Sequence, residues 1–501
     1  MQDGLARQLR LWEEVTAPSS NGQDFGDPAF AANKSRPIHR WVPWIAGFSG
    51  EFVKNALRRY LDRPGLVLDP FAGVGTTLVE ALLLGHQAVG FEINPYAALA
   101  CRVKTTAYAI APEKLYSEMA RFQDFYHSRV EANYTPHTPP PSGFKTRTPF
   151  YSPRVLRKVL IVQDFIYTIQ DPDLQDLFRV AFASTMVLYS NYSYEPSLSR
   201  RQAVGKEEIE DFPVDQAILS KLMEMHRDIL YFREHLPATP AQTRVINDTF
   251  FRYASYLPPE SVDFLVTSPP YLNNYHYNRN TRPQLYWLGY AQSPRDLAFL
   301  ETTNFGQYWQ TVREKERIPL AFSLPDTDLE ERLETLRSLH PERGIYGGYG
   351  WANYAASYFN DCYRFAQGIY DVLKPGGTAL VVIGNSILQG ILFPTDQYLG
   401  KIAEAAGLEL VNIDVPRSTR VGNSIIRADV RVGKARTTDR LYEAVVELRK
   451  LRKSPSGNII RPRTHPGGSL WPGSVSISGS AATSRGSTSA TIPASAPPSW
   501  A

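Results

Sequence analysis

The segment Leu66-Val-Leu-Asp-Pro-Phe-Ala-Gly-Val-Gly-Thr-Thr77 decides the fold expected for this chain. Its first apolar residues predict a short buried strand, and the residues from Asp69 to Gly75 predict a tight turn. A helix is expected to begin at Thr76 and to stop at Gly85, because glycine favours helix ends. A strand, a glycine-containing turn and a helix in this order are typical of an open α/β sheet.

Two glycines of this turn, Gly73 and Gly75, permit positive φ and carry no Cβ, so a ligand can lie against the backbone. The helix after the turn directs free N–H groups at such a ligand. A second apolar strand, Ala88–Phe91, then delivers Glu92 about 20 residues after the glycines, where dinucleotide-type folds place a ribose-binding acid. Together these elements predict a nucleoside-binding half-domain.

A Gly-x-Gly turn alone is weak evidence, because such turns also close strand–helix junctions that bind nothing. The turn lacks the Lys-Ser/Thr ending of a P-loop and departs from the Gly-x-Gly-x-x-Gly spacing of dinucleotide sites. A triphosphate or a pyrophosphate is therefore not the expected ligand. A nucleoside with a small zwitterionic arm fits better, and S-adenosylmethionine is such a molecule.

Composition limits the class of protein. The 501 residues allow two or three domains, or one domain with large insertions. No run of about 18 apolar residues predicts a membrane span, and the N-terminus lacks the layout of a signal peptide. Two distant cysteines exclude a disulfide framework, so we expect a cytoplasmic protein. The net charge of +4, with basic clusters at Lys145–Lys158, Arg200–Lys206 and Arg417–Arg463, is only a weak indication of polyanion binding.

A second motif, Thr267-Ser-Pro-Pro-Tyr271, follows directly after the apolar strand Val262–Val266. A double proline is usually an exposed polyproline turn without consequence. Here it stands at the carboxyl end of a strand that is expected in the same sheet as the glycine turn. Open α/β sheets bind ligands at that edge, so we interpret the motif as functional.

Periodicity and end signals predict the remaining elements. Expected helices are Leu5–Val15, a helix capped by Ser49 that ends near Tyr60, Val155–Ile169, Leu174–Tyr189, Val214–His235, Asp328–Leu339, Tyr354–Leu373 and Asp396–Ala406. Expected strands are Thr243–Asn247, Thr378–Ile383, Leu408–Val415 and Ser424–Val432, with a break at Lys374-Pro-Gly-Gly377 before the second of them.

Asp69-Pro-Phe-Ala-Gly-Val-Gly-Thr76 together with Thr267-Ser-Pro-Pro-Tyr271 resembles the DNA amino-methyltransferases, which modify exocyclic amines. Ser-Pro-Pro-Tyr is similar to the N4-cytosine enzymes, whereas Asp-Pro-Pro-Tyr is more typical of the N6-adenine enzymes. The resemblance covers about residues 60–450, interrupted by two insertions. It implies an α/β fold, namely a Rossmann-like class I S-adenosylmethionine-dependent methyltransferase sheet with helical insertions.

On this resemblance we divide the chain into consecutive parts. They are an N-terminal arm (1–36), the cofactor-binding half of a methyltransferase domain (37–104), a helical insertion that is a candidate for target recognition (105–244), the catalytic part (245–289), a second insertion (290–350), the C-terminal half of the methyltransferase domain (351–453) and a disordered tail (454–501).

The resemblance also implies a set of site residues, with S-adenosylmethionine as cofactor and no metal. The methionine end is expected near the glycine turn, the ribose at Glu92, the adenine near Asp248, and an aromatic contact at Phe48. The implied cofactor-binding residues are Phe48, Asp69, Phe71, Gly73, Gly75, Thr76, Glu92 and Asp248. The implied catalytic residues are Ser268, Pro269, Pro270 and Tyr271.

The chemistry explains why such a motif is useful. A sulfonium methyl is an activated electrophile, so the enzyme has to align an amine lone pair with it. Ser268 Oγ and the Pro269 carbonyl can accept from the amine N–H groups, and Tyr271 can stack on an extruded base at roughly 1–3 kcal/mol. Ser268 is a poor base, so proton loss to water is expected, and no cysteine nucleophile is needed.

The leading hypothesis is therefore a site-specific DNA methyltransferase of restriction-modification type that acts on cytosine N4 with the target base flipped out. An N6-adenine enzyme is the nearest alternative, followed by RNA or protein-glutamine methylation and by a binding subunit without catalysis. The target sequence, a restriction endonuclease partner and the oligomeric state stay open.

Overall fold

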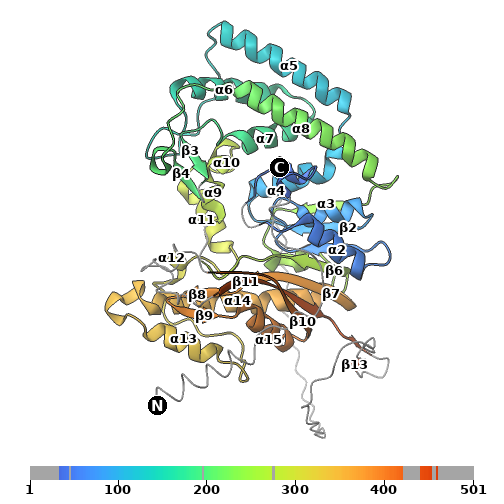
Figure 1. The fold of residues 1–501 in the computed structure, drawn as a ribbon, viewed down its shortest axis with the longest axis vertical. Coiled ribbons are helices and arrows are strands. Elements are labelled where there is room, and N and C mark those ends of the chain that lie inside the picture. The colour runs from blue at the N-terminus through green and yellow to red at the C-terminus, as the bar shows by residue number, and fades with distance from the viewer. Residues whose placement is uncertain are drawn as a thin grey trace, which may run out of the picture. The chain divides into compact units, whose positions relative to one another are not determined.

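A seven-stranded sheet forms the centre of the fold (Figure 1). The glycine turn and the Ser-Pro-Pro-Tyr motif follow the carboxyl ends of two neighbouring strands in its middle. The computed structural model describes residues 33–44, 47–194, 197–273, 277–420, 440–453 and 459–460. The strands lie in the order β10 (Glu409–Arg420), β11 (Arg440–Arg449), β7 (Leu373–Gly384), β6 (Val262–Thr267), β1 (Leu66–Asp69), β2 (Gln87–Phe91) and β5 (Thr243–Ile246). Neighbours from β7 to β5 pair in parallel, and β11 is antiparallel to both of its neighbours. This sheet confirms the predicted Rossmann-like α/β fold.

The order of the strands reverses between β1 and β6. From β1 the chain proceeds outward through β2 to β5, and it then returns to add β6 on the other side of β1. Val67 pairs with Phe264 and Leu68 pairs with Leu265, so the two strands end together. In open α/β sheets ligands bind at such a switch point, outside the carboxyl ends of the strands. The topology therefore brings together two motifs that are nearly 200 residues apart, as the partners Leu68 and Leu265 show.

Helices cover both faces of the sheet, because residues along each strand alternate between two cores. On one face Val67, Phe264 and Leu380 pack with α2 (Gly50–Tyr60) and α3 (Thr76–Leu83). On the other face Leu68 and Leu265 pack with α14 (Gly348–Val372) and α15 (Thr395–Ala405). The Ser49 hydroxyl accepts from Phe52 N at the start of α2, which confirms the predicted cap.

The segment after β2 forms a helical layer, whose core also includes Val79 and Leu82 of α3. Its helices are α4 (Pro95–Thr106), α5 (Pro112–Glu131), α6 (Pro153–Thr168), α7 (Pro172–Thr185) and α8 (Val214–His235), with a hairpin of β3 (Tyr192–Tyr194) and β4 (Leu198–Arg200). Proline at the first helical position and an Asn, Ser or Asp cap begin α4, α6 and α7. Figure 1 shows α5, α6 and α8 stacked away from the sheet, with α4 between them and it.

The segment after β6 adds short helices, and a few small elements complete the described chain. The helices are α9 (Tyr277–Asn280), α10 (Arg282–Trp287), α11 (Pro294–Thr303), α12 (Trp309–Val312) and α13 (Leu329–Ser338). The others are β8 (Ser386–Leu388), β9 (Ile391–Phe393), β12 (Arg452–Lys453), β13 (Ile459–Ile460) and the 3-10 turns η2 (His39–Trp41), η3 (Ala107–Ala109), η4 (Gln202–Val204), η5 (Phe250–Ser255) and η6 (Pro341–Tyr346).

Two predicted boundaries around α14 are wrong. The helix begins at Gly348 instead of Tyr354, because glycine there permits close backbone contact; a Cβ at Gly348 would lie 1.8 Å from Leu336 O. The break expected at Lys374-Pro-Gly-Gly377 is part of β7, since Lys450 N donates to Gly377 O at 3.0 Å. Distant backbone partners decide both boundaries.

Two predicted elements cannot be compared with the structure, and one observed strand was not predicted. The strand expected at Ser424–Val432 and the helix expected at Leu5–Val15 lie outside the described residues. The strand β11, which fills the position between β7 and β10, was not predicted. The division of the chain into functional parts stays a prediction.

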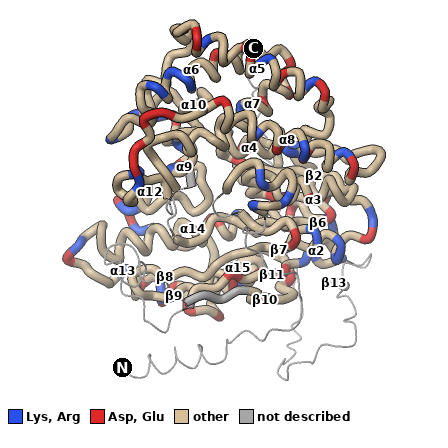
Figure 2. Tube along the Cα trace, turned by 45° about the horizontal axis from the view of Figure 1, so that its top comes forward, with Lys and Arg blue, Asp and Glu red and all other residues tan. Residues whose placement is uncertain are grey.

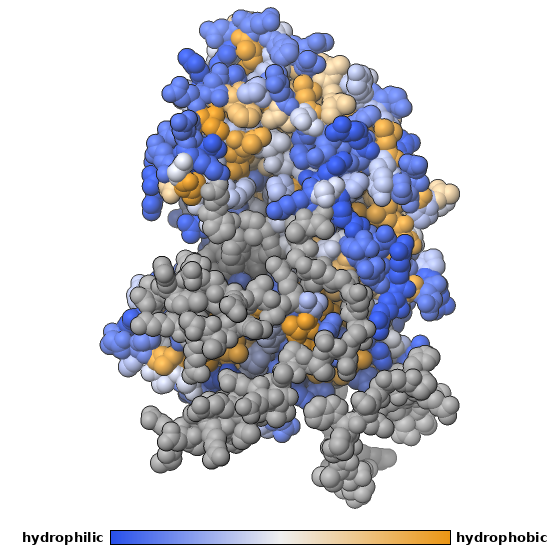
Figure 3. Space-filling model, in the orientation of Figure 1, coloured by the Kyte–Doolittle hydropathy of each residue, from blue (hydrophilic) through white to orange (hydrophobic). Residues whose placement is uncertain are grey.

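The described surface is mixed in charge and hydropathy. Figure 2 shows acidic and basic positions interspersed over the helical layer and the sheet. Figure 3 shows mainly hydrophilic residues over that layer, with scattered apolar ones. Among the described residues, no helix combines the length and the apolar character that a membrane crossing requires.

Candidate active site

The glycine turn and the Ser-Pro-Pro-Tyr motif line one cavity. Phe71 after β1 and Pro270 after β6 both contribute to its wall. The cavity is concave and part of it is open to solvent, so a ligand can enter it from outside. Of the residues expected at the site, those that line it are Phe48, Phe71, Gly73, Glu92, Asp248, Ser268, Pro269, Pro270 and Tyr271.

Asp69 holds the two motifs together from below the cavity. Its fully buried carboxylate accepts from Phe71 N at 3.0 Å and from the hydroxyl of Thr77 at 2.6 Å. Thr267, the last residue of β6, donates to the same carboxylate at 2.5 Å. Burial raises the pKa of Asp69 to about 6 in spite of these hydrogen bonds. Asp69 therefore positions the site and does not line it.

Glu92 presents a carboxylate to the cavity at the end of β2. It accepts from Gly73 N at 2.9 Å and from Asn94 N at 2.7 Å. Burial raises the pKa of Glu92 to about 7, although these backbone donors lower it. Because burial makes the ionised form of Glu92 costly, further hydrogen-bond donors, such as the two hydroxyls of a ribose, would stabilise its carboxylate.

The two glycines of the turn have different surroundings. Gly73, with φ +51°, lines the cavity, and a Cβ there would lie 3.1 Å from Trp44 Nε1. Gly75, with φ +87°, faces α4 instead, because a Cβ there would lie 2.7 Å from Cys101 Sγ. Gly75 and the adjoining Thr76 are not among the cavity-lining residues, so we assign Gly75 to close packing of α4 against the turn.

The aromatic part of the wall comes from three segments that are far apart in the chain. Phe71 packs edge-on against Phe305, with ring centroids 5.3 Å apart, and Phe305 stacks with Phe251 at 6.0 Å. Asp248 lies beside them and accepts from the Tyr256 hydroxyl at 2.7 Å. An aromatic wall with a carboxylate acceptor in the same cavity suits a purine ring that carries an amino group.

The Ser-Pro-Pro-Tyr motif is held by β7, β11 and α14. The Pro270 carbonyl accepts from the Tyr358 hydroxyl at 2.9 Å. The Tyr271 hydroxyl donates to Glu443 at 3.2 Å, and its ring lies against Gly384, where a Cβ would approach two ring carbons to 2.9 Å. Ser268 and Pro269 line the cavity beside this anchored proline, and their expected role as acceptors for a ligand stays a prediction.

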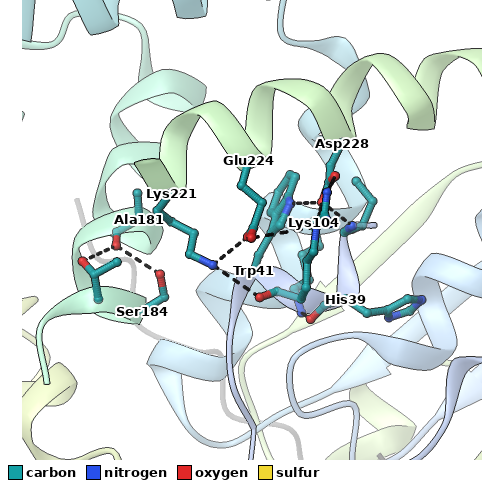
Figure 4. A network of polar contacts seen from close by, with 11 residues as sticks. His39, Trp41, Lys104, Ala181, Ser184, Lys221, Glu224 and Asp228 are labelled. Carbon is teal, nitrogen blue, oxygen red and sulfur yellow. Dashed lines mark hydrogen bonds and ion pairs between the residues drawn. The ribbon is translucent and has the colours of Figure 1, made fainter. Parts of the chain in front are cut away.

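The segment that carries Trp44 and Phe48 is fastened to the helical layer (Figure 4). Asp228 on α8 accepts from Ile38 N at 2.8 Å and from Trp41 Nε1 at 2.9 Å, and it pairs with the Arg40 guanidinium. Lys104 of α4 donates to the carbonyl of His39 at 3.3 Å. Burial lowers the pKa of Lys104 to about 7. These contacts fix the chain immediately before it enters the cavity wall.

Several cavity residues were missed. Trp44, Asn94, Phe251, Phe305 and Glu443 all line it. Asn94 could have been found, since it follows the predicted acid Glu92 and begins a helix as its cap. Phe305 and Glu443 carry no local signal, because only the packing of α14 and β11 brings them to this edge.

The residues present fit S-adenosylmethionine. Glu92 offers acceptors for a ribose, the Phe71, Phe251 and Phe305 rings offer apolar surface for an adenine, and Gly73 contributes backbone to the cavity wall. The assignment of individual residues to parts of the cofactor stays a prediction.

Comparisons with known proteins find similarity to DNA methyltransferases. Residues 29–101 match the family model N6_N4_Mtase, described as DNA methylase. Type II methyltransferase M.BsoBI of Geobacillus stearothermophilus is 24% identical over 434 residues, covering 79% of this chain and 83% of the relative. Type II methyltransferase M.AvaI of Nostoc sp. is 26% identical over 426 residues, covering 79% and 84%. Type II methyltransferase M.MvaI of Kocuria varians is 28% identical over 218 residues, covering 40% and 45%.

Proposed function

The chain belongs to the DNA amino-methyltransferase family, and we propose that it methylates the exocyclic N4 amine of cytosine in DNA at a specific sequence. S-adenosylmethionine is its methyl donor. One observation carries the proposal: Ser268–Tyr271 and the turn after β1 line the same cavity at the switch point of the sheet. The choice of cytosine over adenine rests on Ser268 in the first position of the motif.

When bound, the cofactor supplies an electrophilic methyl carbon, and the residues of the chain place the base against it. Ser268 Oγ and the Pro269 carbonyl accept from the N–H groups of the amine. This draws the amine out of conjugation with the ring and directs its lone pair at the methyl carbon. Tyr271 stacks on the flipped base, and its hydroxyl contact with Glu443 keeps the ring in place.

The methyl transfer needs no nucleophile from the protein. The carbon–nitrogen bond forms as the carbon–sulfur bond breaks, the sulfonium becomes a neutral thioether, and the amine loses a proton to water. Cys101 and Cys362 are both buried, and neither is among the residues that line the cavity. Transfer to an amine is compatible with this, whereas a mechanism through a cysteine adduct is not.

One assay tests the proposal. The protein is given S-adenosylmethionine with a labelled methyl group and duplex DNA, single-stranded DNA or RNA, and the labelled nucleosides are identified. Label in N4-methylcytosine from duplex DNA supports the proposal, and sequencing of the modified DNA then identifies the target site. Label in N6-methyladenine moves the activity to the second candidate, an adenine enzyme with the same machinery. Label only in RNA, or cofactor binding without transfer to any substrate, contradicts the proposal.

A further inference from the structure

The Ser-Pro-Pro-Tyr motif restricts its own backbone, with one angle left open. The proline rings fix φ at Pro269 and at Pro270, and each proline also restricts ψ of the residue before it. The first backbone angle without such a local restriction is ψ of Pro270, because a tyrosine follows that residue. This angle sets the direction in which the chain leaves the prolines, and with it the position of the Tyr271 ring. The motif therefore leaves the placement of this ring to contacts from elsewhere in the fold.

A buried tyrosine on α14 supplies such a contact. The Tyr358 hydroxyl donates to the Pro270 carbonyl at 2.9 Å. The angle ψ describes rotation about the bond that carries this carbonyl, so a hydrogen bond to its oxygen fixes ψ of Pro270. Tyr358 is 1% exposed, and a hydrogen bond is stronger in such an environment than in water. The angle that the motif leaves open is thus set by a distant side chain.

The Tyr358 ring is itself closely packed. Phe305 meets it edge-on, with the ring centroids 5.3 Å apart. Gly306 passes so near that a Cβ there would lie 2.6 Å from Tyr358 Cδ2. The backbone N–H of Gly306 donates to Asp361 Oδ2 at 2.9 Å, and Asp361 lies about one helical turn after Tyr358 on α14. Because its ring is enclosed in this way, Tyr358 offers Pro270 a fixed donor.

The same face of α14 also reaches the turn after β1. Phe365 follows Tyr358 by about two helical turns, so both side chains lie on one face of the helix. The Phe365 ring packs against Phe71, with centroids 5.4 Å apart, and against Phe305 at 5.9 Å. Phe71 and Phe305 both line the cavity. One helix face therefore contacts the motif expected to hold the base and the turn expected to hold the cofactor.

We propose that Tyr358 is a positioning residue for the methyl transfer. Its hydrogen bond to the Pro270 carbonyl sets where the Tyr271 ring meets the target base, and α14 keeps that position constant relative to the cofactor. Tyr358 is not among the residues that line the cavity, so it acts through Pro270 and Tyr271 and not by contact with a ligand. The inference rests on the proposed function, since it presupposes a target base in this cavity.

Removing one hydroxyl tests the proposal. Tyr358→Phe loses the bond to Pro270 and keeps the ring that packs on Phe305. Methyl transfer in a single turnover should slow about fivefold, the order for one neutral hydrogen bond. The reason is that a less firmly placed base is less often in line with the methyl group. The Kd for S-adenosylmethionine, measured by calorimetry, should stay at the wild-type value, because the cofactor turn is unchanged.

Tyr151→Phe is the matched control. The Tyr151 hydroxyl is also a buried donor to a backbone carbonyl, Met186 O at 3.2 Å, but it belongs to the core of the helical layer and not to the cavity wall. Each variant loses one buried hydrogen bond, so both melting temperatures should fall by a similar small amount. Transfer should slow in Tyr358→Phe and stay at the wild-type rate in Tyr151→Phe. Equal transfer rates in the two variants overturn the inference, because the effect of Tyr358 is then on stability alone.

A double-mutant cycle tests the route through Tyr271. If Tyr358 acts by placing that ring, its hydroxyl has no effect on transfer once the ring is absent. Tyr358→Phe should therefore slow the wild type but not the Tyr271→Ala variant. An equal further loss in the Tyr271→Ala background overturns the inference. All rates are compared on the base that the wild-type protein methylates, so failure of this inference is distinct from failure of the proposed function, which the wild-type rate on cytosine reports.

Discussion

Cofactor affinity should depend on pH through Glu92. Burial raises the pKa of this carboxyl to about 7, and only its ionised form can accept from both hydroxyls of a ribose while it keeps its bonds to Gly73 N and Asn94 N. From pH 8 to pH 6 the ionised fraction falls from about nine-tenths to about one-tenth, so the Kd for S-adenosylmethionine should rise about tenfold.

The raised pKa of Glu92 has the opposite effect on the stability of the protein without cofactor, which should decrease as pH rises. Without cofactor the folded protein keeps the Glu92 proton that the unfolded chain loses above its ordinary pKa of 4.5. The free energy of unfolding should therefore fall as pH rises from 4.5 through 7, by up to roughly 3 kcal/mol. Bound cofactor offsets this loss, because its hydroxyls stabilise the carboxylate.

Calorimetric titration of wild type and Glu92→Gln at pH 6, 7 and 8 measures the effect. The variant loses hydrogen bonds to a charged group, each of roughly 1.5–3 kcal/mol, so we expect at least tenfold weaker binding at pH 8. Its affinity should not change with pH except through the amino group of the ligand itself. Glu113→Gln, an exposed site on α5, is the control. Equal wild-type Kd values at pH 6 and pH 8, or the full pH dependence in Glu92→Gln, would refute this account.

Three further changes follow from the contacts around the cavity. Thr267→Val removes a hydrogen bond to the buried carboxylate of Asp69 and should lower the free energy of unfolding in urea by roughly 1.5–3 kcal/mol; an unchanged midpoint would show that this link is not needed. Gly75→Ala should lower the melting temperature, because the new Cβ meets Cys101 at a backbone φ of +87°; a soluble variant of wild-type stability would contradict the packing role. Tyr271→Ala should bind cofactor normally and reduce kcat about tenfold or more, the order for a lost base stack, whereas Tyr271→Phe should keep most of the activity. Equal losses in the two Tyr271 variants would mean that the hydroxyl, and not the ring, matters.

Local signals in the sequence were sufficient for the elements that surround the cofactor edge. A strand at Leu66–Leu68, which the structure extends to Asp69, the glycine turn, the helix from Thr76 and the acid after β2 were all predicted. These elements are short, adjacent in the chain and marked by apolar periodicity and glycine, so neighbouring residues are enough to specify them. The Ser-Pro-Pro-Tyr motif was predicted at the same edge because it follows an apolar strand.

Tertiary contacts decided what local signals could not. Gly73 and Gly75 look equivalent in the sequence, yet one lines the cavity and the other packs against Cys101, because only α4 distinguishes the two sides of the turn. Phe305 and Glu443 reach the cavity through the packing of α14 and the pairing of β11 with β7.

The sequence by itself thus determined two local motifs, a turn suited to binding a nucleoside and a motif that can accept hydrogen bonds from an amine. Each of them depends on residues that are adjacent in the chain. Only the tertiary structure decided that they share a cavity and that Asp69 joins them through Thr77 and Thr267. The physical reason is the pairing of β1 with β6, which brings two segments that are distant in the chain together at the carboxyl ends of neighbouring strands.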